Sequence, residues 1–521
     1  MDRYKVEIIL SLGLSELILI LVINVPHFLG HNGLVAAAYL QKAGLNVGVF
    51  ENREIIGGAA VTEEIFPGFK FSRCSYVLSL LRPQIIKDLE LKKFGLKVYI
   101  RDPSSYTPVL KEYSNGVPKA LMLGRDGDEN RRQIAQFSRH DAEIFDKYEA
   151  FLAEIVSAID PLYDHQALDI DAIMNGNIKA KWKNLPSLYA LLQTGVLLIV
   201  FLGLLRYVLL HHVMGEVDGI KGAWGYAEGG MGAVSSAIAR CAESHGASIF
   251  TNSSVKAITL DSKSKKAVGI VLKSGEEISA RVVLSNATPY ITYTQLLPNE
   301  ALQEEHVRSI RNFDYSSPVA KINVAINQLP NFTATPNTTN KLPGPQHRGT
   351  IHLNCEHPKL IHDAYEDLMK GEISKRPVIE MCIPSAIDPT VAPSGSHVVS
   401  LFTQYVPYKM NNSPEWTTVA RDNYANAVFE NIDEYAPNFS KSILGYEVLA
   451  PPDLQKIFGL TSGNIFHGAL SPDQLYFNRS PTCPNKSIKG VFICGSGSHP
   501  GGGVSGAPGR LAALNALSYL Q

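Results

Sequence analysis

The stretch GHNGLVAAAYLQKAGLNVGVFENREIIGG, Gly30–Gly58, decides the fold. Gly30 and Gly33 open a run of small and apolar residues that predicts a helix, and Gly44 ends it as a C-cap glycine does. The segment that follows, NVGVFE, alternates in polarity and predicts a strand that ends at Glu51. A helix between two parallel strands forms a βαβ unit, so the stretch predicts an α/β, Rossmann-like domain.

The acid at the end of this strand predicts a dinucleotide site. Glu51 lies about 20 residues after Gly30, a spacing that places its carboxylate at the ribose hydroxyls of a bound adenosine. The pyrophosphate would lie over the backbone N–H groups at the start of the helix. However, the G-x-G-x-x-G motif has a glycine where this chain has Phe28, and Pro26 removes a backbone donor from the first strand. An ordinary βαβ unit that binds no ligand therefore remains an alternative to a dinucleotide site.

Composition excludes several classes of protein. The 521 residues carry 48 Lys+Arg against 49 Asp+Glu, a formal net charge of −1, which excludes a nucleic-acid binder that works through bulk positive charge. The six cysteines are scattered without a C-x-x-C pair, which excludes a disulfide scaffold, a zinc ribbon and a dithiol redox centre. We expect no metal site, and we interpret His211 and His212 as a surface or packing pair. Only 19% of the residues are charged, so the chain is unusually apolar.

Part of this apolar character lies in two runs. Residues 8–25 are nearly long enough to span a bilayer but contain Glu16. A buried strand, a membrane anchor and an altered start of the gene product are the alternatives for this run. Thr194–Val213 is interrupted at Arg206 and predicts a buried helix, with membrane contact or the wall of an apolar tunnel as alternatives. No targeting peptide is legible.

Other segments predict further elements. Ser254–Leu272 predicts a pair of strands, and Arg281–Pro289 predicts a further strand. Glu129–Ile159 has helical apolar spacing with many charges, so we expect an exposed amphipathic helix there. Val491–Cys494 predicts a strand that runs into a glycine-rich loop, and a helix is expected after Pro508.

Three segments together resemble a known family. They are ENREIIGGAAVT (Glu51–Thr62), WGYAEGGMGAVSSAIARCAESHGASIF (Trp224–Phe250) and KGVFICGSGSHPGGGVSGAPGRLAALNAL (Lys489–Leu517). Their glycines and the strand-end acid resemble FAD-dependent amine oxidases and, more closely, the phytoene desaturase and carotenoid-retinoid oxidoreductase family. The resemblance begins at Gly30 and continues nearly to the end of the chain. It breaks at residues 1–29 and near Thr194–Arg206, as in a splice variant or a gene-model artefact.

The resemblance implies FAD as cofactor and a glutathione reductase type of FAD-binding domain with an interleaved α+β substrate domain. The flavin domain would comprise residues 30–75, 222–290 and 484–521, the substrate domain and lid residues 76–221 and 291–483, with 1–29 as an atypical N-terminal segment. The implied cofactor-binding residues are Gly30, His31, Asn32, Gly33, Leu34, Glu51, Arg53, Gly57, Gly58, Val255, Gly495, Gly503, Val504 and Gly506. Val255 would contact the adenine through its backbone, and His499 would either approach the flavin ring or fix its own loop by a hydrogen bond.

The implied function is an FAD-dependent oxidoreductase acting on an apolar small molecule, such as a polyene or an isoprenoid. No Ser/His/Asp signature, HExxH motif or P-loop is present, and no catalytic residue is assigned. Flavin chemistry is compatible with this, because hydride transfer mainly requires alignment in an apolar pocket. The alternatives are a catalytically silent member that regulates mitochondrial function, with FAD binding impaired by Phe28, and a non-redox isomerase. The resemblance further implies a mitochondrial location, and contact with a membrane surface or a mitochondrial protein stays open.

Overall fold

The computed structural model describes residues 19–23, 30–166, 213–339, 342–411, 415–471, 474–475, 479 and 488–521. Its first domain is built on a parallel sheet of five strands in the order β11-β2-β1-β15-β21. These strands are β1 (Leu19–Ile23), β2 (Asn46–Phe50), β11 (Ser248–Phe250), β15 (Val282–Ser285) and β21 (Val491–Ile493). The order places the beginning, the middle and the end of the chain side by side in one sheet.

Both faces of this sheet are covered, as is usual for parallel strands. One face packs against α2 (His31–Lys42), α3 (Pro83–Asp88), α10 (Gly232–Ser244) and α16 (Ala507–Leu520). The other face packs against β12 (Val255–Leu260), β13 (Ala267–Leu272), β14 (Glu277–Ser279), α11 (Pro289–Ile291) and α12 (Glu304–Arg311). Neighbouring residues of β15 alternate accordingly, since Val282 and Leu284 face the helices whereas Val283 faces the small sheet.

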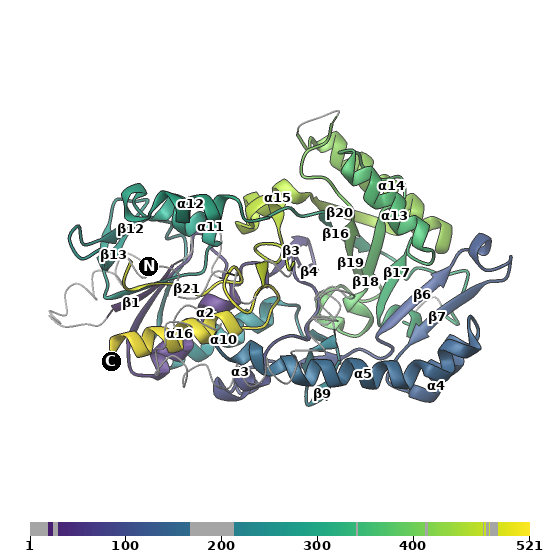
Figure 1. The fold of residues 1–521 in the computed structure, drawn as a ribbon. Helices are drawn as coiled ribbons and strands as arrows, with labels where there is room; N and C mark the ends of the chain where they lie inside the picture. Colours follow the sequence, from purple (N-terminus) through teal and green to yellow (C-terminus); the bar gives the residue numbers. More distant parts are fainter. Residues whose placement is uncertain are drawn as a thin grey trace.

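A second, mixed sheet forms the other half of the molecule (Figure 1). Its seven strands lie in the order β20-β16-β19-β18-β17-β6-β7, and all neighbours are antiparallel except β17 and β6. They are β6 (Ser105–Val109), β7 (Lys119–Leu123), β16 (Val319–Ile326), β17 (Thr350–Leu353), β18 (Val378–Cys382), β19 (His397–Gln404) and β20 (Ile443–Leu449). Helices α13 (Pro358–Met369) and α14 (Thr418–Tyr435) pack on it. This is an α/β fold with an interleaved second domain, as the family resemblance implies.

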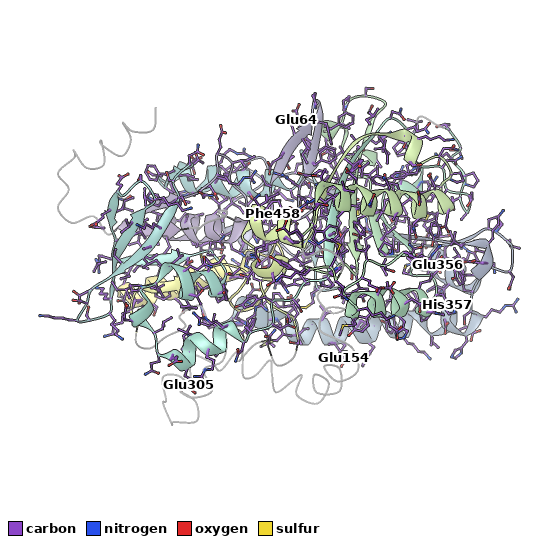
Figure 2. The ribbon with its side chains drawn as sticks, turned by 90° about the horizontal axis from the view of Figure 1, so that it is seen from above. Glu64, Glu154, Glu305, Glu356, His357 and Phe458 are labelled. Atoms are coloured by element: carbon purple, nitrogen blue, oxygen red, sulfur yellow. The ribbon has the colours of Figure 1, made fainter. Side chains whose placement is uncertain are left out.

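Short elements connect the two halves. They are β3 (Thr62–Phe66), β4 (Phe69–Ser72), β5 (Val98–Ile100), β8 (Glu216–Val217), β9 (Ile220–Lys221), β10 (Gly225–Ala227) and α15 (Pro451–Phe458). Phe458 lies near the middle of the molecule in Figure 2 and packs with Val61 and Val319, which come from different halves. The two halves are therefore joined by apolar packing as well as by the segments that pass between them.

The predicted elements of the first domain are largely confirmed. Helix α2 and strand β2 occupy the predicted positions within Gly30–Gly58, and β12 and β13 form the predicted strand pair. Of the alternatives for residues 8–25, the structure has a strand at Leu19–Ile23, paired with β2 on one side and β15 on the other. The remainder of that run, Pro26, Phe28, residues 194–212 and the pair His211–His212 lie outside the described residues. In the part of the chain that is described, no helix is both long and apolar enough to cross a membrane.

The single exposed helix predicted for Glu129–Ile159 is wrong in two respects. The segment forms two helices, α4 (Gly127–Ala135) and α5 (Arg139–Asp164), because the side chain of Ser138 accepts a hydrogen bond from the Asp141 N–H and caps a new helix. Helix α5 is also partly buried, since Ile155 and Ile159 pack in a small apolar cluster with Leu470. It runs along one edge of the molecule beside both halves, and Glu154 lies on its exposed side (Figures 1 and 2).

The expected division of the chain also differs from the observed packing. The sheet includes β1, which the division leaves in the separate segment 1–29. Residues of the segment around α3, including Leu81, Ile85 and Leu89, pack in the same core as α2, although the division places residues from 76 onward in the substrate domain. Helix α3 is amphipathic and short, so its sequence indicates burial but not the core in which it is buried.

Candidate functional site

The N-terminus of α2 forms the first part of the site. Gly30 is its N-cap, no side chain among the described residues caps it, and its first turn contains no acidic residue. Gly30 also forms a parallel β-bridge with Gly57, and a Cβ on Gly30 would lie 3.0 Å from Nδ2 of Asn286. The positive end of the helix dipole therefore points to a place where backbone N–H groups can bind an anion such as a pyrophosphate.

Glu51 forms the second part, at the end of β2. Its side chain is fully buried (0% exposed), and its Oε1 accepts a hydrogen bond from the Arg53 N–H at 2.7 Å. The chain before β12 is held alongside, because the Ser253 N–H donates to the Glu51 carbonyl at 2.7 Å. Val255, the first residue of β12, is thereby placed near the strand-end acid, as an adenosine site requires. The guanidinium of Arg53 forms an ion pair with Glu63 at 2.6 Å.

The turn after β2 requires glycine. Gly57 has φ +119°, and a Cβ there would lie 2.5 Å from the carbonyl oxygen of Ala60 and 3.1 Å from Oγ of Ser235. Gly58 also has a positive φ, +58°. An L-residue at position 57 would meet both backbone strain and a clash with the Ala60 carbonyl, so this turn depends on the missing side chain.

The C-terminal glycine loop forms the third part. Gly495 follows β21, and a Cβ on it would lie 2.5 Å from the Asn286 carbonyl oxygen. Gly506 caps α16 in the left-handed conformation (φ +74°), and a Cβ on Gly509 would lie 2.0 Å from the Asn32 carbonyl oxygen. Gly503, with φ +110°, and Val504 border a cavity. The starts of α2 and α16 are therefore in close contact.

Two histidines near this loop are neutral. Burial lowers the pKa of His499 to about 4, and its Nε2 lies 3.0 Å from the Leu162 carbonyl oxygen, which agrees with the expected role of fixing the loop by a hydrogen bond. Burial also lowers the pKa of His31 to about 4. Neither ring carries a charge at neutral pH, so neither adds a positive charge beside a bound cofactor.

The residues fit FAD. Two buried polar atoms at the start of α2, Nε2 of His31 and Oδ1 of Asn32, have no hydrogen-bond partner among the described residues. His31 lines the cavity, so an occupant there would give its free nitrogen a partner. The α2 N-terminus would hold the pyrophosphate, Glu51 the ribose, Val255 the adenine, and the loop around Gly503 the flavin end. When bound, FAD supplies the hydride acceptor or donor.

The start of α2 at Gly30, the turn at Gly57 and the loop at Gly495 follow β1, β2 and β21 and so lie at the carboxyl ends of parallel strands, where α/β sheets bind their ligands. Leu34 differs from the other predicted residues, because its side chain is fully buried in the core between α2 and the sheet. Only its backbone would therefore be available to a ligand at the start of the helix. Among the described residues, no group of three or more His, Cys, Asp or Glu side chains could hold a metal ion.

A cavity of about 1050 Å³ lies beside the glycine loop. One side is formed by the flavin-binding segments, through His31, Ala59, Ser496, Gly503 and Val504. An apolar wall is formed by Leu454, Leu460, Ile465, Phe466 and Leu470. A third part of the lining comes from the seven-stranded sheet and the segment before it, with Tyr76, Arg101, Lys321, Glu380 and Phe402.

This third part contains buried charged groups that were not predicted from the sequence. The hydroxyl of Tyr76 donates to Oε2 of Glu380 at 3.2 Å, and Nζ of Lys321 lies 5.3 Å from the centre of the Tyr76 ring. Lys321 is 2% exposed, and burial lowers its pKa to about 8. Its Nζ donates to Oδ1 of Asn323 at 2.5 Å. The sequence contains one signal for this cluster. Lys321 and Asn323 are two residues apart in the otherwise apolar run VAKINVAI, and residues at that spacing share one face of a strand.

Comparison with known proteins tests the family resemblance. The profile of flavin containing amine oxidoreductases matches residues 33–507. The chain belongs to this family. It is an FAD-dependent oxidoreductase, as its sequence motifs and the fit of its α2–Glu51 site to the cofactor indicate.

Individual relatives cover nearly the whole chain. The rat pyridine nucleotide-disulfide oxidoreductase domain-containing protein 2 is 49% identical over 533 residues, 93% of this chain and 91% of the rat protein. A lycopene-forming phytoene desaturase of Paracoccus sp. is 22% identical over 93% of this chain and 94% of its own length. The crystal structure of an oxidoreductase from Methanosarcina mazei superimposes with a TM-score of 0.55 at 18% identity, covering 96% of this chain and 99% of that one, and shows the same fold.

Proposed function

We propose that this flavin oxidoreductase transfers a hydride between FAD and a largely apolar small molecule of polyene or isoprenoid-like type. The observation that carries the proposal is the cavity of about 1050 Å³, which joins the flavin-binding loop at Gly503 and Val504 to the apolar wall at Leu460 and Phe466. Its volume is slightly above the roughly 300–1,000 Å³ of small-molecule sites, and the flavin end of FAD would take the part beside Gly503 and Val504. The similarity to a phytoene desaturase supports the same class of substrate.

The residues around the cavity suit a reaction that depends on alignment. The side chains of Ile465 and Phe466 border it on one side and Phe402 on another, so an apolar substrate would displace water as it binds. Burial lowers the pKa of His467 to about 3 and that of His31 to about 4, so these two imidazoles are neutral at physiological pH. The protein's contribution would be orientation and the exclusion of water.

The proposal is tested on the purified full chain by its visible flavin absorbance. We expect bound FAD whose absorbance is bleached under anaerobic conditions by a polyene such as phytoene. Alternatively, we expect the dithionite-reduced flavin to be reoxidised by a more desaturated polyene. Ile465→Trp should place an indole into the cavity and slow this step about tenfold or more without loss of FAD. Leu444→Trp, at a position that is 55% exposed on β20, is the matched control.

The result that would overturn the proposal is a colourless protein that does not take up added FAD, or a flavin that no polyene or isoprenoid reduces or oxidises. The first result would favour the catalytically silent alternative, which was raised by Phe28, a residue outside the described part of the chain. A mitochondrial location and a mitochondrial protein partner stay predictions from the family resemblance.

A further inference from the structure

Arg101 is a buried cation at the edge of the cavity. It follows β5, where its N–H donates to the Trp224 carbonyl at 2.9 Å. Its side chain lines the cavity and is only 4% exposed. The guanidinium stacks near two aromatic rings, with its central carbon 5.9 Å from the centre of the Trp224 ring and 5.3 Å from that of Tyr226. These contacts fix the orientation of the group.

The guanidinium lacks a compensating charge. Its Nη1 donates to Oγ1 of Thr350 at 2.7 Å and lies 3.6 Å from Sγ of Cys382, while its Nε has no hydrogen-bond partner among the described residues. In the part of the chain that is described, Arg101 forms no ion pair with an acidic side chain. Burial raises the pKa of Tyr226, so this neighbour is neutral at physiological pH. A buried cation without an anion is costly.

The nearby acid does not serve as the partner. Glu380 lines the same cavity, but its Oε2 accepts from the Tyr76 hydroxyl at 3.2 Å and its Oε1 lies 3.4 Å from Nε2 of Gln404. Lys321 adds a second buried cation to this region, and its pKa of about 8 leaves it mostly protonated at neutral pH. Arg101 and Lys321 therefore contribute two cations to the lining, Glu380 and Asp314 are its acidic residues, and Glu447 acts electrostatically on Lys321. Because Arg101 has no ion pair among the described residues, an anionic ligand is favoured beside this guanidinium.

We propose that Arg101 binds a carboxylate on the substrate, so that the substrate is an apolar carboxylic acid rather than a pure hydrocarbon. The planar fork of a guanidinium matches the two oxygens of a carboxylate, and the Nε edge is the edge without a protein partner among the described residues. The apolar body would then lie along Leu460 and Phe466 toward the flavin loop. This inference rests on the proposed function and refines its substrate class.

The test compares a fatty acid anion with its uncharged methyl ester, using the FAD-loaded full chain. Oleate and methyl oleate are titrated while the flavin spectrum and the protein fluorescence are followed. We expect oleate to bind at least about tenfold more tightly, because a charge-assisted hydrogen bond contributes about 1.5–3 kcal/mol. Arg101→Gln should reduce this preference to less than about threefold and leave the affinity for methyl oleate and the FAD content unchanged, whereas Arg101→Lys should keep part of it. Arg125→Gln, which removes an exposed positive charge outside the cavity lining, is the control.

Three results would overturn the proposal: equal affinities in the unchanged protein, an undiminished preference in Arg101→Gln, and tighter binding of an alkyl phosphate than of the carboxylate. If Arg101→Gln does not fold, the affinities of the unchanged protein and of Arg101→Lys for oleate and methyl oleate still test the proposal. The proposed function fails separately. If neutral polyenes reduce the flavin and acids are not preferred, only the proposal that Arg101 binds a carboxylate is overturned. If acids are preferred but the flavin is not reduced, only the proposed hydride transfer is overturned.

Discussion

The side-chain amide of Asn32 donates from Nδ2 to Oγ of Ser496 at 3.0 Å, across 464 residues of sequence. Asn32 lies in the first turn of α2, and Ser496 lies in the glycine loop after β21. The hydrogen bond is buried and connects the segment expected at the pyrophosphate to the segment expected at the flavin ring. The two ends of the chain therefore form one continuous binding surface.

Ser496→Ala removes this hydrogen bond and leaves the Asn32 amide without it. We expect FAD to bind about 2- to 10-fold more weakly, because a neutral hydrogen bond contributes about 0.5–1.5 kcal/mol. The measurement is the dissociation constant of FAD by fluorescence quenching on apoprotein. Ser244→Ala, in the last turn of α10 and with its hydroxyl bonded within the same helix, should have no effect. An unchanged FAD affinity in Ser496→Ala would mean that the two segments are held together without this bond.

Glu51→Gln should weaken FAD binding about tenfold or more. The buried carboxylate is expected to accept hydrogen bonds from the ribose hydroxyls, and an amide offers only one accepting oxygen of weaker strength. The variant should fold, since Gln can still accept from the Arg53 N–H. Retention of FAD on gel filtration and the dissociation constant are the measurements. Glu54→Gln is a control close in sequence, and equal affinities of the two variants would contradict the assignment of Glu51.

Gly57→Ala should destabilise the protein by about 1–3 kcal/mol and reduce its FAD content. Its φ of +119° is strained for alanine, and the Cβ would lie 2.5 Å from a backbone oxygen. Gly395→Ala separates these two effects, because Gly395 has φ +80° but a Cβ there would have no neighbouring atom within 4 Å among the described residues. Urea unfolding and flavin absorbance are measured for both. FAD loss in Gly395→Ala as large as in Gly57→Ala would contradict a local role for Gly57.

Lys321 should make stability depend on pH in the alkaline range. Burial lowers its pKa from 10.5 to about 8, so between these values the unfolded chain holds more protons and the free energy of unfolding rises with pH. Lys321→Met should remove this rise. The free energy of unfolding of the variant minus that of the unchanged protein should therefore be greatest near pH 7.5. It should decline toward pH 10 by up to about 1.4 kcal/mol per pH unit. Urea unfolding at several pH values measures the difference.

Other ionisable groups lie near Lys321. Cys74, Cys382 and Glu447 act on it electrostatically, and Tyr76 contributes its ring. These groups are present in both proteins, so the difference between the two unfolding curves reports the loss of Lys321 together with its coupling to them. Lys256→Met, at an exposed position of β12, is the control and should give a difference that does not change with pH. A pH-independent difference for Lys321→Met would contradict the lowered pKa.

The cofactor site could be predicted from sequence because its signals are local. The helix period of α2, the glycines on either side and the acid at Glu51 all lie within one stretch, and each has a separate physical reason. The charged end of the cavity could not be predicted in this way. Arg101, Lys321 and Glu380 come from segments separated by tens to hundreds of residues, and only the fold brings them together. The apolar, polyene- or isoprenoid-like substrate is inferred from the family resemblance and the composition, neither of which reports where individual charges are buried.

The three-piece flavin sheet also has a consequence for biosynthesis. Strand β21 and helix α16 are translated long after their packing partners, since β21 pairs with β15 and α16 packs directly against α2. A nascent chain on the ribosome thus holds the Gly30–Glu51 unit with an unfinished sheet edge and an exposed apolar helix face until β21 and α16 have been made. Such intermediates are prone to aggregate, so chaperones would protect the chain during this interval. A stop codon placed just before β21 would leave most of the described residues but no complete cofactor site.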